Sequence, residues 1–147
     1  IIKVLENYIS VNLSGGKKYN LSTELQGYNI PENLLPARFF ESDCMLTDVQ
    51  LVNDNSYRFD FELTDIDVRG YIGVTKFTEK FEIGYNYSDI YAESEQLQQL
   101  TTDGLQIVVY SSVDGVVKIF YQSESFIFDI VICDLTFNEV IKIFEKF

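Results

Sequence analysis

Residues 57–64 alternate strictly between apolar and polar side chains. Successive side chains of a β-strand point to opposite faces, so this alternation predicts a strand with one buried face and one face toward water or a partner. The apolar set is Tyr57, Phe59, Phe61 and Leu63, and the polar set is Arg58, Asp60, Glu62 and Thr64. We expect the apolar set to be core.

Similar patterns predict β-structure from residue 45 to residue 133. Further strands are expected at 46–52, 68–74, 81–87, 105–111, 116–122 and 126–133. Turns are indicated at 53–56 and at Asp114-Gly115, because Asn, Asp and Gly tolerate the backbone that tight hairpins need. Residues 126–133 are the most apolar, which favours a central strand. Gly70 and Gly73 indicate a bulge or a close approach within their strand.

The remaining segments are less regular. Residues 1–13 fit either a helix or a strand, and the paired glycines after Ser14 favour a hairpin with strands at 8–13 and 18–23. Residues 24–42 carry both prolines, Pro31 and Pro36, which disfavours a long regular element, and the apolar residues 33–40 predict a packed connection over the core. The polar stretch 89–100 allows a short helix.

The end of the chain predicts an amphipathic helix over residues 137–147. Thr136 and Glu139 have the spacing of a capping box, in which a hydroxyl and a carboxylate three residues apart satisfy two backbone donors. Val140, Ile141 and Phe144 then recur at helical spacing.

Together these elements predict one domain over residues 1–147, of the α+β class and dominated by β-structure. We expect an antiparallel meander of about eight to ten strands, curled into a half-barrel or a sandwich, with the C-terminal helix packed on it.

Charge narrows the class of partner. The formal net charge is −12, which disfavours contact with nucleic-acid phosphates or anionic lipid and favours a basic protein partner. The acid is concentrated: residues 41–67 hold eight acids against Arg58 alone, a net of −7, and residues 81–117 hold six acids with no Lys or Arg, a net of −6. A solvated acidic surface that only aids solubility is the simpler explanation.

The absence of histidine excludes a His-dependent catalytic triad and the usual zinc sites. No phosphate loop or dinucleotide fingerprint is present. Asn53-Asp54-Asn55 and Asp65-Ile66-Asp67 lack the spacing of a calcium loop. We therefore expect no cofactor, no metal and no enzymatic activity, although neighbouring carboxylates such as Asp60 and Glu62 can in principle do acid–base work. Cys44 and Cys133 could form one disulfide, but a free buried thiol is expected at Cys133.

The candidate residues are therefore those of a protein interface. Tyrosine beside carboxylate is a common interface composition, although alternating tyrosines can equally be core. The candidate partner-binding residues are Glu41, Asp43, Asp48, Asp60, Glu62, Asp65, Asp67, Tyr87, Asp89, Tyr91, Glu93 and Glu95.

Residues 39–51, which read FFESDCMLTDVQL, resemble a phrase of small bacterial toxin-immunity proteins. In that family an aromatic–His–Asp–small phrase leads into the first strand of a meandering antiparallel sheet. Asp43 and Cys44 match the Asp and the small residue, while Ser42 stands where the family has His. The resemblance covers about residues 39–134 and implies a non-catalytic inhibitor of one cognate toxin in the cytoplasm.

The expected function is thus a binding protein, such as an immunity protein whose acidic face covers a basic toxin domain. Two other functions fit the pattern: a phage-type inhibitor whose carboxylates mimic DNA phosphates, and a small-ligand-binding β-barrel with an aromatic interior. No stretch of 18 apolar residues and no signal-peptide core is present, so a cytoplasmic location without membrane contact is expected. The oligomeric state is left open.

Overall fold

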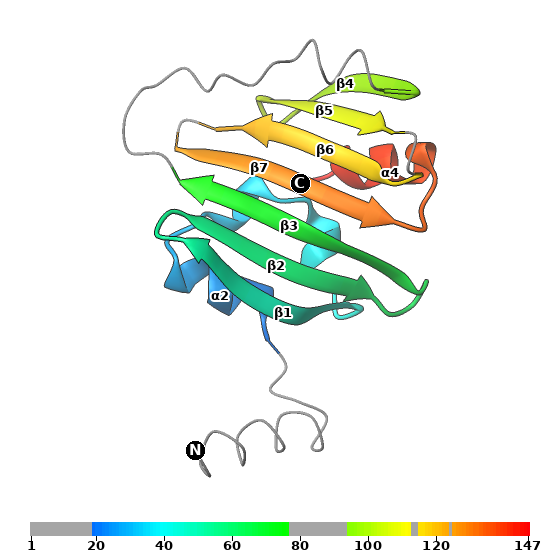
Figure 1. The fold of residues 1–147 in the computed structure, drawn as a ribbon. Coiled ribbons are helices and arrows are strands. Elements are labelled where there is room, and N and C mark those ends of the chain that lie inside the picture. The colour runs from blue at the N-terminus through cyan, green and yellow to red at the C-terminus, as the bar shows by residue number, and fades with distance from the viewer. Residues whose placement is uncertain (1–18, 77–93, 113–114, 124) are drawn as a thin grey trace.

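The computed structural model describes residues 19–76, 94–112, 115–123 and 125–147. In these residues seven antiparallel strands form one open sheet in the order β1-β2-β3-β7-β6-β5-β4 (Figure 1). The strands are β1 (Cys44–Asn53), β2 (Ser56–Leu63), β3 (Val68–Lys76), β4 (Gln96–Thr102), β5 (Leu105–Ser111), β6 (Val117–Gln122) and β7 (Phe126–Cys133). The helices are α2 (Leu21–Gly27), η1 (Glu32–Leu34), η2 (Ala37–Phe40) and α4 (Phe137–Phe144). The predicted β-dominated α+β class is confirmed.

The sheet consists of two meanders. Strands β1, β2 and β3 form one, and β4, β5, β6 and β7 form the other. The ladder between β3 and β7 joins them, from Arg69 opposite Cys133 to Lys76 opposite Phe126. Strand β7 is therefore the middle strand, as its apolar sequence predicts. Because all described strands belong to this one sheet, the arrangement is neither a sandwich nor the closed barrel that a ligand-binding interior would need.

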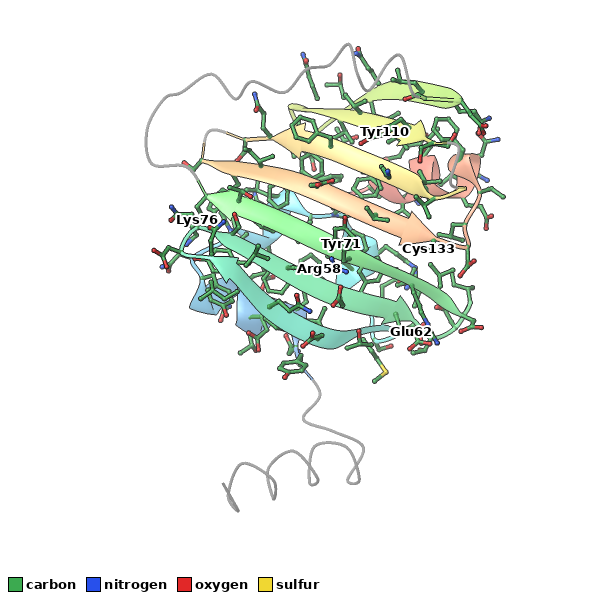
Figure 2. The ribbon with its side chains drawn as sticks, viewed as in Figure 1. Arg58, Glu62, Tyr71, Lys76, Tyr110 and Cys133 are labelled. Atoms are coloured by element: carbon green, nitrogen blue, oxygen red, sulfur yellow. The ribbon has the colours of Figure 1, made fainter. Side chains whose placement is uncertain are left out.

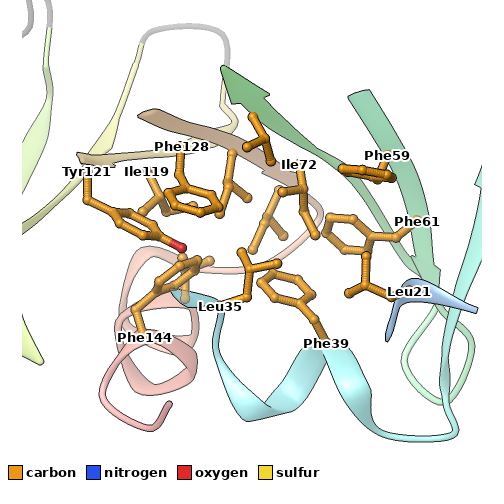
Figure 3. Close-up of a cluster of buried hydrophobic side chains, with 14 of the residues drawn as sticks. Leu21, Leu35, Phe39, Phe59, Phe61, Ile72, Ile119, Tyr121, Phe128 and Phe144 are labelled. Carbon is orange, nitrogen blue, oxygen red and sulfur yellow. The ribbon is translucent and has the colours of Figure 1, made fainter. Parts of the chain in front are cut away.

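All described helices lie on one side of the sheet, and the hydrophobic core fills the space between (Figures 1 and 3). The side chains of Tyr57, Phe59, Phe61 and Leu63 are buried, as the alternation predicts. Phe39 from η2 meets Phe61 edge-on, with ring centroids 5.0 Å apart, and approaches Phe144 of α4 at 6.1 Å. Such contacts between aromatic rings stabilise a core beyond the area they bury. The connection at 33–40 lies over the core, as predicted.

Helix α4 begins with the predicted capping box. The hydroxyl of Thr136 accepts a hydrogen bond from the Glu139 amide at 3.2 Å, and the Glu139 carboxylate accepts one from the Thr136 amide at 3.1 Å. Val140, Ile141 and Phe144 are buried against the sheet. The helix ends at Phe144, three residues before the predicted end.

Two predicted elements are wrong. The expected strand at 18–23 is wrong from Leu21 onward, where α2 begins, because the Asn20 side chain caps the helix by accepting a hydrogen bond from the Thr23 amide at 3.1 Å. The expected helix within 89–100 is wrong from Gln96 onward, where β4 pairs with β5 along its whole length. The expected elements at 8–13 and 81–87 lie outside the described residues, as does the Asp114 turn position.

Candidate functional site

The side of the sheet away from the helices carries the candidate site. We use the term open face for the outward side chains of β1, β2, β3 and β7, which Figure 2 shows toward the viewer. Their cross-strand pairing sets them in rows. One row runs from Asp48 through Asp60 and Tyr71 to Val131, and a second runs from Met45 through Glu62 and Arg69 to Cys133.

The open face does not extend over the whole sheet. Val108 of β5 is opposite Phe120 of β6, and Phe120 is opposite Asp129 of β7. Asp129 is opposite Gly73 of β3, which is in turn opposite the outward Arg58 of β2, so Val108 and Phe120 are also on the outward side. Both side chains are nevertheless buried. The accessible part is therefore the half formed by β1, β2, β3 and the near side of β7.

A shallow hollow of about 620 Å³ lies in this half. It is lined by Thr47, Arg58, Asp60, Phe61, Glu62, Arg69, Gly70, Tyr71, Val131 and Cys133. Gly70 is required there: a Cβ atom would meet the Val131 carbonyl oxygen and lie 2.7 Å from Cζ of Phe61. The predicted close approach of the backbone at Gly70 is confirmed.

Arg58 is held in place on the open face. Its guanidinium carbon lies 3.9 Å from the centroid of the Tyr71 ring, and its Nε donates a 2.8 Å hydrogen bond to Oδ1 of Asp60. Stacking on a ring and a charge-assisted hydrogen bond together fix a long side chain, so less conformational entropy is lost when a partner binds. An aromatic ring and an arginine in one cluster are typical of energetically important interface residues.

Two neighbouring groups have shifted acidities. Burial raises the pKa of Tyr71 above its ordinary value, and the charge of Asp129 adds to the rise. Burial also raises the pKa of Asp129, while the charge of Lys118 opposes the rise. Asp129 is thus a half-buried carboxylate beside the Arg58–Tyr71 pair, and desolvation is the main influence on it.

Five candidate carboxylates gather at one end of the sheet. Residue Cys44 at the start of β1 is opposite Leu63 at the end of β2, and the Thr64 amide donates a 2.9 Å hydrogen bond to the Asp43 carbonyl. These pairings bring the residues just before β1 next to the residues just after β2. We use the term acidic end for Glu41, Asp43, Glu62, Asp65 and Asp67.

Arg38 partly neutralises the acidic end from the helix side. Its guanidinium binds Oε2 of Glu41 at 2.8 Å and the two carboxylate oxygens of Asp65 at 2.7 and 2.9 Å. The Arg38 side chain is only 16% exposed, so this pairing ties η2 to the turn after β2. Asp67 is exposed in that turn, with a φ of 53°.

The outward side of β2 was expected to carry Arg58 among its carboxylates, and the structure adds a second cation from β3. Arg69 is opposite Glu62, and Arg58 is bonded to Asp60, so positive and negative groups alternate on the open face. Asp48 also has a local role: its carboxylate accepts hydrogen bonds from the Val49 amide at 3.0 Å and the Gln50 side chain at 2.8 Å.

The second acidic stretch lies elsewhere. Glu95 precedes β4, at the opposite edge of the sheet from β1, and is exposed. Tyr87, Asp89, Tyr91 and Glu93 lie outside the described residues. The structure therefore unites the candidates of residues 41–67 and separates them from Glu95.

Sequence reasoning named Arg58 but missed Arg38 and Arg69, and it missed the contacts that all three cations make. Arg38 lies 27 residues before its partner Asp65, and nothing local in the sequence indicates the pair. The stacking of Arg58 on Tyr71 depends on the register of β2 against β3. The alternation within each strand was the available signal, since it assigns Arg58 and Tyr71 to outward positions once the register is known.

The described residues contain no group of three or more His, Cys, Asp or Glu side chains that could hold a metal ion. Cys44 and Cys133 are free thiols, and Cys133 is half-buried rather than fully buried as expected. Burial raises the pKa of Cys44 to about 11, so its thiol is protonated near neutral pH and is a weak nucleophile.

No helix among the described residues has the length and apolar composition to cross a membrane. Comparison of the chain with protein-family models, with curated proteins and with solved structures found no match, so the functional conclusion depends on the geometry of the open face and the acidic end.

Proposed function

We propose that this protein is a non-catalytic inhibitor that binds a basic partner protein through the acidic end and the open face beside it. A bacterial toxin domain with a basic active site is the kind of partner that fits best. The gathering of Glu41, Asp43, Glu62, Asp65 and Asp67 at one end of the sheet carries the proposal.

Electrostatics support a basic partner. The net of −7 in residues 41–67 falls on β1, β2 and their flanking turns, which are adjacent at one edge of the sheet. A local field of this sign steers a basic protein into contact and raises the association rate, with a strong dependence on salt. At the acidic end the five carboxylates outnumber the two arginines beside them, Arg38 and Arg69, by three charges.

The open face supplies contacts of defined geometry, which long-range electrostatic attraction alone does not provide. Arg58 and Tyr71 form a rigid aromatic–cation pair, and the adjacent hollow can take a protruding side chain. A central anchor with a charged rim is the usual anatomy of a specific interface. The alternating charges argue for a folded protein partner and against a surface that mimics a row of phosphates, since Arg58 and Arg69 interrupt the carboxylates.

The proposal predicts neutralisation of a toxin encoded next to this gene. The experiment expresses the neighbouring gene product in a bacterial host with and without this protein and measures growth, then measures binding of the two purified proteins. Protection together with tight binding supports the proposal. Absence of both, for every adjacent gene, contradicts it.

A matched pair of variants tests the surface. Asp43→Asn, Glu62→Gln and Asp67→Asn together remove three charges from the acidic end. Glu24→Gln, Glu32→Gln and Glu145→Gln remove three charges from the helix side, so both variants change the net charge from −12 to −9. We expect the first variant alone to slow association about tenfold at low salt. Equal effects from the two variants would mean that only total charge matters and would refute the assigned surface.

A further inference from the structure

A second hollow lies on the helix side of the sheet, between η2 and the end of α4. Its volume is about 210 Å³, and it is lined by Ala37, Arg38, Glu41, Lys142, Ile143 and Lys146. We use the term basic hollow for this set. Its three cations and one carboxylate give a net of +2, in a chain whose net charge is −12. The basic hollow is therefore opposite in sign to the chain as a whole.

The backbone of α4 places the two lysines of the basic hollow side by side. Glu145 closes the helix with φ −81° and ψ −14°, which are still right-handed helical angles. Lys146 therefore lies about one turn beyond Lys142 on the same face, because residues four apart in a helix are neighbours. Both side chains are exposed, and neither forms an ion pair with a described residue. Two positive charges are thus adjacent and unpaired.

The floor of the basic hollow is apolar and held in place. Ile143 is half-buried and packs against the core, and the Ala37 amide donates a 3.2 Å hydrogen bond to the Lys146 carbonyl. Phe39 and Phe144, from the same two elements, point into one core with their ring centroids 6.1 Å apart (Figure 3). These contacts form the hollow before any partner binds. The helix dipole favours a cation in the last turn, but it requires no apolar floor between two cations.

Arg38 connects the basic hollow to the acidic end. Its side chain lines the hollow, while its Nη1 binds Glu41 and its Nη2 binds both carboxylate oxygens of Asp65. The surface therefore changes sign across one arginine side chain. A partner that covers the acidic end also reaches the basic hollow. Because two carboxylates occupy the Arg38 guanidinium, Lys142 and Lys146 are the cations that remain for a ligand.

We propose that the basic hollow is a second anchor of the same interface and that it binds one carboxylate of the basic partner protein, carried next to an aliphatic group. The two lysine ammonium groups donate hydrogen bonds to the carboxylate, and Ala37 and Ile143 pack against the aliphatic group. The hollow also fixes the orientation of the partner, since a reversed partner would set its cations against Lys142 and Lys146. The inference rests on the proposed function for the identity of the partner, but not for the chemistry of the hollow.

N-acetyl-leucine tests the basic hollow on the full chain, because it joins one carboxylate to one aliphatic side chain. N-acetyl-leucinamide is its uncharged match. Amide signals are followed by NMR during a titration with each compound at constant ionic strength. We expect N-acetyl-leucine to shift the signals of residues 37–41 and 142–146 saturably, with the millimolar dissociation constant that is usual for so small a ligand. N-acetyl-leucinamide should bind about tenfold more weakly, since it lacks the charge-assisted hydrogen bonds.

Two single variants with equal charge make the titration specific. Lys146→Gln removes a charge from the basic hollow, and Lys76→Gln removes one from the end of β3 that is away from the acidic end, so both change the net charge from −12 to −13. We expect Lys146→Gln to weaken N-acetyl-leucine binding about fivefold and Lys76→Gln to leave it unchanged. No saturable shift, equal binding of the two compounds, or equal losses in the two variants would each overturn the proposal.

The double variant Lys142→Gln with Lys146→Gln tests the hollow against the cognate partner. It changes the net charge from −12 to −14, so the long-range attraction of a basic partner is not weakened. We expect dissociation to become about tenfold faster while association is not slowed, because a short-range contact is lost. The acidic-end variant should instead slow association.

The two proposals fail in different ways. Toxin neutralisation with an unchanged dissociation rate in the double lysine variant would retain the proposed function and overturn the role of the basic hollow. Saturable binding of N-acetyl-leucine by a chain that neutralises no adjacent toxin would refute the proposed function and retain the hollow as a carboxylate site.

Discussion

The hydroxyl of Tyr121 donates a 2.7 Å hydrogen bond to the main-chain carbonyl of Leu34, 87 residues earlier in the chain. Tyr121 is 1% exposed in β6, its ring stacks on Phe128 at 4.7 Å, and burial raises its pKa well above the ordinary value. Figure 3 shows the side chain among the core aromatics, near Leu35 and Phe144. This bond fixes the end of η1 to β6 of the sheet.

Tyr121→Phe should therefore lower the free energy of unfolding by about 1–3 kcal/mol, because the Leu34 carbonyl loses its partner in a largely dry environment. Urea unfolding measures the change. Tyr28→Phe is a suitable control, since the Tyr28 ring is retained against Tyr57 at 4.1 Å and its hydroxyl has no partner among the described residues. Equal losses in the two variants would contradict the role of the bond.

Gly70→Ala should destabilise the protein by about 1–3 kcal/mol, since the added methyl group collides with the Val131 carbonyl and the Phe61 ring. Thermal unfolding provides the measurement. Gly27→Ala serves as the control, because nothing lies within 4 Å of a Cβ at that position in α2. Its expected effect is neutral or slightly stabilising, as alanine has the higher helix propensity. If Gly70→Ala left the unfolding temperature unchanged, β3 and β7 could move apart at this position without loss of stability.

The capping box should make the contribution of Glu139 to the stability of the fold depend on pH. Hydrogen bonds from the Thr136 side chain and backbone lower the pKa of Glu139. A carboxylate with a lowered folded-state pKa stabilises the fold above its unfolded pKa, and this contribution is lost as pH falls through the folded value. Thr136→Ala should return the pKa of Glu139 toward its ordinary value and cost about 0.5–2 kcal/mol near neutral pH. An NMR titration of the Glu139 side chain, with Glu145 as internal reference, tests this; an unchanged pKa would refute it.

Cys44 should react slowly with iodoacetamide near neutral pH. A pKa of about 11 instead of 9.0 lowers the thiolate fraction about 100-fold, and the rate should rise as pH approaches 11. Mass spectrometry of a Cys133→Ser variant follows Cys44 alone, and the urea-unfolded protein provides the reference rate. Rapid labelling of the folded protein at pH 7 would show that the half-buried position of Cys44 does not raise its pKa.

The fold was predictable where pattern and turn chemistry agree. The bounds of β5 and β7 follow from apolar runs of strand length, and the burial of Phe59 and Phe61 follows from strict alternation. The helix α2 was missed because the capping signal at Asn20 is a single side chain beside a segment that also fits a hairpin. The hairpin of β4 carries the same Asp-Gly signal as residues 114–115, at Asp103-Gly104, and this signal was overlooked in a polar stretch.

The carboxylates of the candidate site could be predicted from the sequence, but the groups that contact them could not. Net charge and its clustering are properties of the sequence, so the carboxylates of residues 41–67 were visible. Their neighbours depend on strand register and on long-range contacts. The pairing of Glu62 with Arg69 requires the β2–β3 register, and the binding of Asp65 by Arg38 requires η2 to lie against the turn after β2.

The central position of β7 has a consequence for the order in which the chain can fold. The first meander, β1 to β3, can form while the rest of the chain is still being synthesised, but the edge of β3 stays unpaired until β7 emerges. The inward side chains Ile72 and Val74, which end fully buried, would then lie beside an exposed edge for most of translation. Completion of the sheet is therefore a late step that depends on the last 22 residues of the sequence, and nascent chains stopped before residue 126 should be prone to edge-to-edge association.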